Sequence, residues 1–352
     1  MLTKKQILEI KSHLEKAQNP LFFFDNDSDG LCSFLILQRY IGRGKGIPIR
    51  SFPTLDADYS RKILELNADY VFILDKPVVS KEFLEEVFRL NIPIVWIDHH
   101  EIDKSQIPDF VNYYNPLFNK KKSNEPTTHL CYQATRKSDD LWIAVLGCIA
   151  DGLVPEFYTK FKEKYPDLSF DSENAFDIFY NSQIGKILKL FNFGLKDRVT
   201  NVIYMLKFLM KAKNPYEILE EKKENYLMHK RYKEISQKYN KLIEKARELK
   251  DSGKLLFFSY GGDLSISSDL ANELSYKNPD KYVIVGYVSG FKVNVSGRGK
   301  NVREFVLKAI EGLKDARGGG HENAVGAQVR VDDLDMFKER MGELINNNIK
   351  NT

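Results

Sequence analysis

The chain has 352 residues, with 53 lysines and arginines against 49 aspartates and glutamates, and a formal net charge of +4. This length exceeds what one hydrophobic core usually supports, so we expect two or three domains. Hydrophobic residues make up 43% of the chain and charged residues 29%, a mixture typical of a folded, soluble protein and not of a disordered one. The balanced charge is compatible with a polyanionic partner but does not by itself indicate one.

Three sequence features concern the cellular compartment. Cys32, Cys131 and Cys148 lie within apolar stretches and at no metal-binding or redox spacing, which predicts buried thiols in a reducing compartment. The first residues contain no signal-peptide core, and the longest apolar run, residues 141–150, is about half as long as a bilayer span. We therefore expect a cytoplasmic protein without membrane segments.

Up to residue 160, short apolar runs alternate with amphipathic segments. Nearly continuous apolar runs are expected for strands buried on both faces, and strands that alternate with helices predict a parallel sheet with right-handed crossovers. In such sheets, functional side chains gather at the carboxyl ends of the strands. The predicted strands are Leu21–Phe24, Tyr70–Leu74 and Ile94–Ile97, and the predicted helices are Leu31–Ile41, Ser60–Leu66 and Lys81–Leu90.

From residue 165 to 250, strand signals disappear and Lys, Glu, Asn and Tyr dominate. After Asn214 and Pro215, which signal a helix start, apolar or small residues recur at alternating steps of four and three, the spacing of a heptad seam. The seam residues are Met228, Tyr232, Ile235, Tyr239, Leu242, Ala246 and Leu249. Two interpretations remain open: a long helix packed on its own domain, or a helical insertion that also associates with other copies of the chain.

The last hundred residues predict a second α/β unit. Its predicted strands are Leu255–Tyr260, Tyr282–Val288 and Phe291–Val295, and its predicted helix is Val302–Leu313. We thus expect an α/β chain with domains at residues 1–165 and 253–352, joined by a helical segment at 166–252.

Three carboxylates, those of Asp25, Asp27 and Asp29, follow directly on the first predicted strand and precede Gly30. Carboxylates this close repel one another strongly unless a cation is present, so a bound metal is the natural explanation. A cluster that caps a helix N-terminus remains as an alternative. A calcium loop is excluded because its later ligands and its bidentate Glu are absent.

Three further acidic sites also follow apolar segments. Asp75 follows the second predicted strand, Asp98–His100 follows the third, and Asp151 follows the longest apolar run. Adjacent histidines beside an aspartate suit ligation by one imidazole and substrate contact by the other. Four acidic sites at the corresponding ends of apolar segments predict that all of them lie on one rim of one sheet.

This ligand set predicts a particular class of metal. Many carboxylate oxygens together with imidazole favour Mn²⁺ or Mg²⁺ over structural zinc. Enough carboxylates are present to bridge two ions about 3.5–4 Å apart, a spacing that stabilises both the attacking and the leaving oxygen of phosphoryl transfer.

Two features of the last hundred residues suit phosphate binding. Gly318, Gly319 and Gly320, followed by His321, let the backbone approach a phosphate and present its N–H groups, although a mobile glycine hairpin is the alternative. Arg298 lies between glycines as the chain leaves a strand and offers a guanidinium for phosphate, although a solvated turn is equally compatible.

In this order and spacing, the motifs resemble those of a known family. The motifs Asp27-x-Asp29-Gly30, Asp75, Asp98–His100 and Asp151 are similar to the four motifs of the DHH phosphoesterase superfamily, and Gly318–His321 is similar to the signature of its DHHA1 companion domain. The length and the helical insertion resemble the archaeal RecJ-like nucleases, particularly the Hef-associated nuclease group. The resemblance implies a parallel-sheet DHH catalytic domain at 1–165, a helical insertion and linker at 166–252, and a smaller DHHA1 substrate-binding domain at 253–352.

Carried over residue by residue, the resemblance implies two Mn²⁺ ions, with Mg²⁺ as the alternative. The implied ligands are Asp27 and Asp75 for the first ion, and Asp29, Asp75, His99 and Asp151 for the second. Many members place a histidine four residues before the first metal-binding aspartate, where this chain has Phe23. Asp25 is therefore a further candidate ligand of the first ion.

The resemblance also implies the substrate contacts. His100 would face the scissile phosphate, and Asp98 would orient the pair of histidines. From the second domain, Arg298 and His321, with the glycine backbone, would hold the nucleic acid across the cleft between the domains.

As an activity, the resemblance implies a Mn²⁺-dependent exonuclease specific for single strands, acting 3′→5′ on single-stranded DNA in DNA repair or replication. It also implies a homo-oligomer, in particular a trimer held by the insertion, and a repair helicase or nuclease partner such as Hef. The alternatives are an exonuclease for short oligonucleotides or RNA, and a Cdc45-like scaffold that binds replication partners without catalysis. Because the acidic positions and both histidines are intact, the sequence favours the enzyme.

Overall fold

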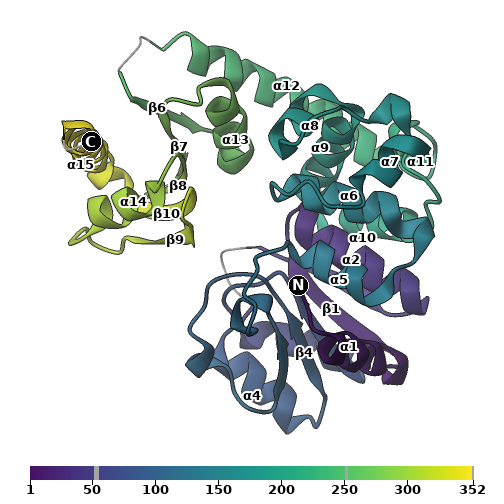
Figure 1. The fold of residues 1–352 in the computed structure, drawn as a ribbon. Helices are drawn as coiled ribbons and strands as arrows, with labels where there is room; N and C mark the ends of the chain where they lie inside the picture. The colour runs from purple at the N-terminus through teal and green to yellow at the C-terminus, as the bar shows by residue number, and fades with distance from the viewer. Residues whose placement is uncertain (51–54, 250–252, 351–352) are drawn as a thin grey trace. The chain divides into compact units, whose positions relative to one another are not determined.

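The computed structural model describes residues 1–50, 55–249 and 253–350 (Figure 1). Its contacts divide the chain into two compact units, Met1–Lys233 and Glu234–Thr352. The boundary between the units lies within one long helix, α12 (Tyr226–Arg247). None of the helices in the described ranges is long and apolar enough to cross a membrane.

The first unit contains a five-stranded sheet in which all neighbouring strands are parallel, with the order β2-β1-β3-β4-β5. Its strands are β1 (Pro20–Asp25), β2 (Lys45–Ile49), β3 (Tyr70–Leu74), β4 (Ile94–Ile97) and β5 (Val111–Tyr114). The predicted parallel α/β sheet and its three predicted strands are confirmed. The sequence did not indicate β2 or β5, because Gly46 and Pro48 interrupt the apolar pattern of β2 and because β5 has only four residues.

Helices cover both faces of this sheet. Because side chains alternate along a strand, Phe22 and Phe24 of β1 lie in one hydrophobic core, whereas Leu21 and Phe23 lie in another. The helices of the first core include α1 (Lys4–Lys16), α2 (Ser28–Ile41), α5 (Thr127–Thr135) and α6 (Leu141–Ala150), and those of the second are α3 (Ser60–Glu65) and α4 (Lys81–Arg89). The predicted helices at α2, α3 and α4 are confirmed to within a few residues.

The described residues between 158 and 249 form helices and their connections, without strands. The helices are α7 (Tyr158–Lys164), α8 (Ala175–Asn181), α9 (Gln183–Leu195), α10 (Val199–Leu209), α11 (Tyr216–Leu219) and α12. Arg39 of α2 fixes the end of α10, because its guanidinium pairs with buried Asp140 at 2.6 Å and donates to the carbonyl oxygens of Leu209, Met210 and Ala212. Helix α2, which begins at the acidic motif, is therefore anchored to the helical segment.

The seam of α12 is largely buried within the chain itself. In the first unit, Met228 is part of the hydrophobic core and Tyr232 packs against it. In the second unit, Tyr239 is buried and its hydroxyl donates to Glu273 at 2.5 Å. Leu249, at the end of the seam, is 45% exposed. These contacts support the interpretation of a helix packed on its own chain, and the predicted trimer stays a prediction.

The second unit is a mixed five-stranded sheet with the order β6-β7-β8-β10-β9. Its strands are β6 (Leu255–Gly261), β7 (Tyr282–Ser289), β8 (Lys292–Arg298), β9 (Arg317–His321) and β10 (Ala324–Arg330), and its helices are α13 (Ser267–Lys277), α14 (Val302–Ile310) and α15 (Leu334–Lys350). Only β6 and β7 pair in parallel. The predicted second α/β unit is confirmed, and its glycine run forms the edge strand of the β9–β10 hairpin.

Candidate active site

The acidic motif occupies the turn from β1 into α2. Asp25 ends the strand, and Asp27 is the N-cap of the helix, its carboxylate accepting from the Gly30 N–H at 2.9 Å. A Cβ atom at residue 30 would lie 2.4 Å from the Asp25 carbonyl oxygen, so only glycine allows this close approach. The capping role considered for this motif is therefore real for Asp27, and it leaves the second carboxylate oxygen of Asp27 for other contacts.

Asp29 lies in the first turn of α2 and is only 3% exposed. Its two carboxylate oxygens accept from the backbone N–H groups of Thr127 and Thr128, at 2.9 and 2.8 Å, where α5 begins. The start of a helix presents N–H groups that have no partner within the helix, and these stabilise a negative charge. Neither threonine was predicted as a site residue from the sequence, although Pro126 before them is a typical signal of a helix start.

Asp75 stands at the end of β3 and is 3% exposed. Its backbone has a φ of 60°, in the left-handed region that aspartate adopts more readily than most residues. The Thr127 hydroxyl donates to its carboxylate at 3.1 Å. Burial, together with the nearby charges of Asp29 and Asp27, raises the pKa of Asp75 well above the ordinary value.

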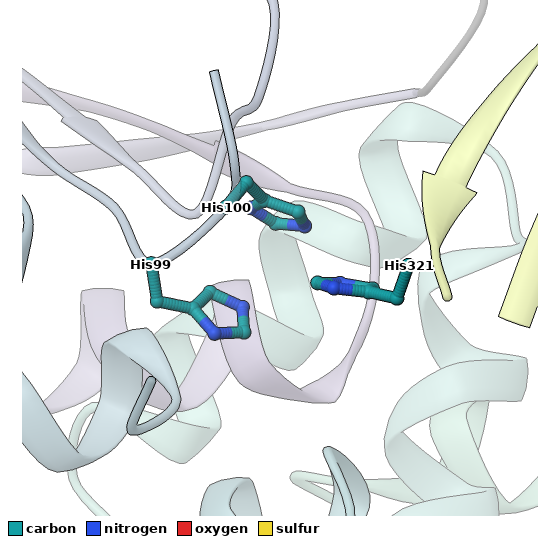
Figure 2. Close-up of side chains that lie close together, drawn as sticks. All are labelled: His99, His100 and His321. Atoms are coloured by element: carbon teal, nitrogen blue, oxygen red, sulfur yellow. The ribbon is translucent and has the colours of Figure 1, made fainter. Parts of the chain in front are cut away.

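His99 and His100 follow β4, and their rings meet edge to face with centroids 4.5 Å apart (Figure 2). Nε2 of His99 lies 3.4 Å from a carboxylate oxygen of Asp75, 3.7 Å from Asp151 and 4.0 Å from Asp29. This imidazole therefore joins three of the predicted acidic positions. Figure 2 also labels His321, which belongs to the second unit.

Asp98 orients His100 and sets its charge. The buried carboxylate accepts a 2.8 Å hydrogen bond from Nδ1 of His100, and the Tyr113 hydroxyl donates to its other oxygen at 3.3 Å. Burial alone would lower the pKa of His100, but Asp98, and to a lesser extent Asp75, raise it to about 9. His100 is therefore an imidazolium at neutral pH, held in one orientation.

Asp151 reaches the site from the end of a helix and not from a strand. The apolar run before it is the buried helix α6, and Asp151 is the residue that caps the carboxyl end of this helix. Its carboxylate nevertheless lies 3.7 Å from Nε2 of His99, which follows β4, so Asp151 stands at the same end of the sheet as the other acidic sites. A short apolar run does not distinguish a buried strand from a buried helix by periodicity alone, so the kind of element before Asp151 was open in the sequence.

The side chains form three groups in which one ligand atom from each residue lies within 4.8 Å of the others. The groups within the first unit are Asp29–His99–Asp151, Asp25–Asp27–Asp75 and Asp75–Asp98–His100. These carboxylates lie close together, with Asp29, Asp75 and Asp98 buried and Asp27 and Asp151 open to solvent, and their mutual repulsion favours a cation. Oxygen ligands with one or two imidazoles suit Mn²⁺ or Mg²⁺, so the residues present fit a divalent metal.

The predicted phosphate-binding residues lie in the second unit. Arg298 of β8 and His321 of β9 both stand opposite Ala324 of β10, so they occupy one row of the sheet and point to the same face. The Arg298 guanidinium donates to Asn272 at 2.5 Å and to the Gly297 carbonyl at 2.8 Å. Asn272 was not predicted from the sequence, since a lone asparagine in a helix carries no recognisable signal.

Comparisons with known proteins agree with this architecture. Residues 21–153 match the DHH family, N-terminal domain, and residues 252–347 match the DHHA1 domain. None of the curated proteins matches the chain in sequence. The two domain matches support the DHH/DHHA1 superfamily for this chain, with the acidic motifs in the first domain and the glycine run in the second.

Solved structures show the same fold at low sequence identity. RecJ from Thermus thermophilus in complex with Mn²⁺ is 16% identical with a TM-score of 0.70, and the match covers 97% of this chain and 54% of RecJ. An exonuclease RecJ bound to manganese is 16% identical with a TM-score of 0.66, covering 97% of this chain and 94% of that one. CDC45 from Entamoeba histolytica is 9% identical with a TM-score of 0.54, covering 96% and 98%. The chain thus spans about half the length of Thermus thermophilus RecJ.

Proposed function

We propose that this protein is a Mn²⁺-dependent phosphodiesterase that removes nucleotides from single-stranded nucleic acid, acting 3′→5′ on DNA. One observation carries the proposal: in a DHH domain, four separate segments bring the carboxylates of Asp29, Asp75 and Asp151 around the imidazole of His99. Such an activity suits the trimming of single strands in DNA repair or replication.

The chain's own residues have distinct tasks in this reaction. Bound divalent metal would polarise the scissile phosphate and lower the pKa of a water molecule. The residues that would hold the metal are Asp27, Asp29, Asp75, His99 and Asp151. His100 would donate from Nε2 to a phosphate oxygen, because Asp98 engages Nδ1 and keeps the ring positively charged.

The second unit would bind the strand. Arg298 and His321 present cationic or hydrogen-bonding groups on one face of the sheet, and β9 is an edge strand made largely of glycine. An edge strand leaves every second N–H group without a neighbour in the sheet, and glycine lets a phosphate approach those groups closely. These features suit the sugar-phosphate backbone and do not read base sequence.

A second candidate function is a scaffold without catalysis, because CDC45 from Entamoeba histolytica shares the fold over nearly the whole chain. The set of metal-binding side chains argues against it. A scaffold has no need to keep several carboxylates and two histidines close together, since the carboxylates repel one another unless a cation is bound.

Digestion of a short single-stranded DNA tests the proposal. We expect Mn²⁺ to support stepwise release of mononucleotides, chelator to abolish it, and a duplex of the same sequence to resist. A strand labelled at its 5′ end should yield a ladder of shortening products, whereas a 3′ label should be released at once as a mononucleotide. An immediate release of the 5′ label would reverse the proposed polarity, and no release under any metal would favour the scaffold.

The same assay with the Arg298→Ala variant tests whether the second unit binds the substrate strand. We expect a higher KM and a shallower dependence of affinity on salt, because one phosphate contact is lost. The kcat value and Mn²⁺ affinity should stay unchanged. Lys338→Ala, in the same unit, provides a control for the loss of one positive charge.

A further inference from the structure

Lys76 is a buried lysine beside the acidic cluster, the name used here for the neighbouring carboxylates of Asp25, Asp27, Asp29, Asp75 and Asp151. Its side chain is 3% exposed, and its ammonium lies 2.6 Å from a carboxylate oxygen of Asp25. The backbone next to it is fixed as well, because the Lys76 carbonyl accepts from the buried indole N–H of Trp96 at 3.0 Å. Asp75, directly before it, has the left-handed φ of 60° that redirects the chain at this point. The ammonium is therefore buried and paired with Asp25.

This ammonium occupies one side of the cluster only. Asp25 shares a possible metal position with Asp27 and Asp75. A divalent cation bound to Asp25 would have a metal–oxygen distance of about 2.1 Å, which places it within about 5 Å of the Lys76 nitrogen. At that separation and low exposure, the two cations repel each other strongly.

The other side of the cluster has a different environment. Asp29 is oriented by the N–H groups at the start of α5, which donate to both of its carboxylate oxygens and carry no full positive charge. His99 contributes an imidazole that faces Asp29 and Asp151 within 4.0 Å. This side therefore offers a nitrogen and several carboxylate oxygens to an incoming metal.

We infer that Lys76 is a positioning residue whose ammonium occupies the Asp25 side of the cluster, so that the protein binds one divalent ion tightly at Asp29, Asp75, His99 and Asp151 and a second ion only weakly. The inference rests on the proposed function to the extent that the cluster binds divalent metal at all. In this arrangement Asp25 pairs with Lys76 and does not ligate the tightly bound metal. The weak second ion would then be recruited together with the phosphates of the substrate.

Titration of the metal-free full chain with Mn²⁺, followed by the electron paramagnetic resonance signal of free Mn²⁺, tests the inference without reference to activity. Wild-type protein should bind one equivalent tightly and a second at least tenfold more weakly. Lys76→Met removes the charge and keeps an apolar stem suited to burial. In this variant the second equivalent should bind at least tenfold more tightly than in the wild type. Lys62→Met, at an exposed lysine paired with Glu65, is the matched control and should change nothing.

Asp25→Asn provides an independent variant if Lys76→Met does not fold. Because Asp25 does not ligate the tight ion, this change should leave the affinity of the first equivalent within about twofold of the wild type, whereas a loss of tight binding would overturn the inference. Two equivalents of equal affinity in the wild type would also overturn it and would leave the proposed function standing. Absence of any Mn²⁺ binding would contradict both the inference and the proposed function.

Discussion

Replacing Asp75 with asparagine should reduce the turnover of single-stranded DNA by roughly 10³-fold or more, because the Asp75 carboxylate lies between the candidate ligands on the two sides of the cluster. Asp75 forms one group with Asp25 and Asp27, and it lies 3.4 Å from His99, which forms another group with Asp29 and Asp151. Asparagine has the same shape, accepts the hydrogen bond of Thr127 through its amide oxygen, and tolerates the left-handed φ of this position. The loss would therefore report the missing charge and not a disturbed backbone.

Single-turnover kinetics at saturating Mn²⁺ measure this effect, since they separate the chemical step from binding. Asp109→Asn is the matched control, because Asp109 is an exposed aspartate of the same unit and lies outside the cluster. The control should keep the wild-type rate. If folded Asp75→Asn protein also kept it, the assignment of the site would be wrong.

At a fixed concentration that is about a hundredfold its Kd at pH 8, Mn²⁺ should raise the melting temperature of the metal-free protein by about 5 °C at pH 8 and by less at pH 6. Metal-free protein carries closely spaced buried carboxylates whose repulsion grows as they lose protons. The cation removes that repulsion, so its effect is largest where most carboxylates are ionised.

The sign of the pH dependence follows from the direction of the pKa shifts. Burial and neighbouring carboxylates raise the pKa of Asp75, and Asp98 raises that of His100 to about 9 against the effect of burial. In both cases the folded chain binds more protons than the unfolded chain, so the free energy of unfolding falls as pH rises. For His100 this stabilising contribution is complete below a pH of about 6.5 and is lost as pH rises through about 9.

Thermal denaturation across this pH range, with and without metal, checks the prediction. Asp75→Asn should show a weaker pH dependence without metal and a smaller gain from Mn²⁺. A metal-free melting temperature that rose from pH 6 to pH 8, or a Mn²⁺ effect independent of pH, would contradict the account of the cluster.

The sequence predicted those parts of the fold that depend on local pattern. Apolar runs such as Tyr70–Leu74 identified the central strands of the parallel sheet, because strands buried on both faces have few polar residues. The edge strand β5 and the glycine-containing β2 carry weaker patterns and were missed. The edge strand β9 (Arg317–His321) was not predicted as a strand, and a glycine hairpin was only an alternative there, because glycine has no side-chain pattern and the strand is defined by its pairing with β10.

The residues of the candidate site that belong to a motif after a strand were predicted from the sequence. Those that reach the site only through contacts between distant segments were missed. Asp29, Asp75 and His99 were recognised from their order along the chain. Thr127 contacts Asp29 and Asp75 across sequence separations of 98 and 52 residues, which no local pattern encodes. Lys76 was overlooked for a related reason, because a lysine after a strand is ordinarily a surface residue, and only the folded chain brings it to Asp25.

The claim on which the rest depends is that the acidic cluster binds divalent metal. Anomalous X-ray diffraction at the manganese edge, from crystals grown with Mn²⁺, tests it most directly. We expect a strong peak bounded by Asp29, Asp75, His99 and Asp151, and a weaker one or none beside Asp25. The absence of any peak within reach of Asp75 and His99 in fully formed crystals would contradict the account.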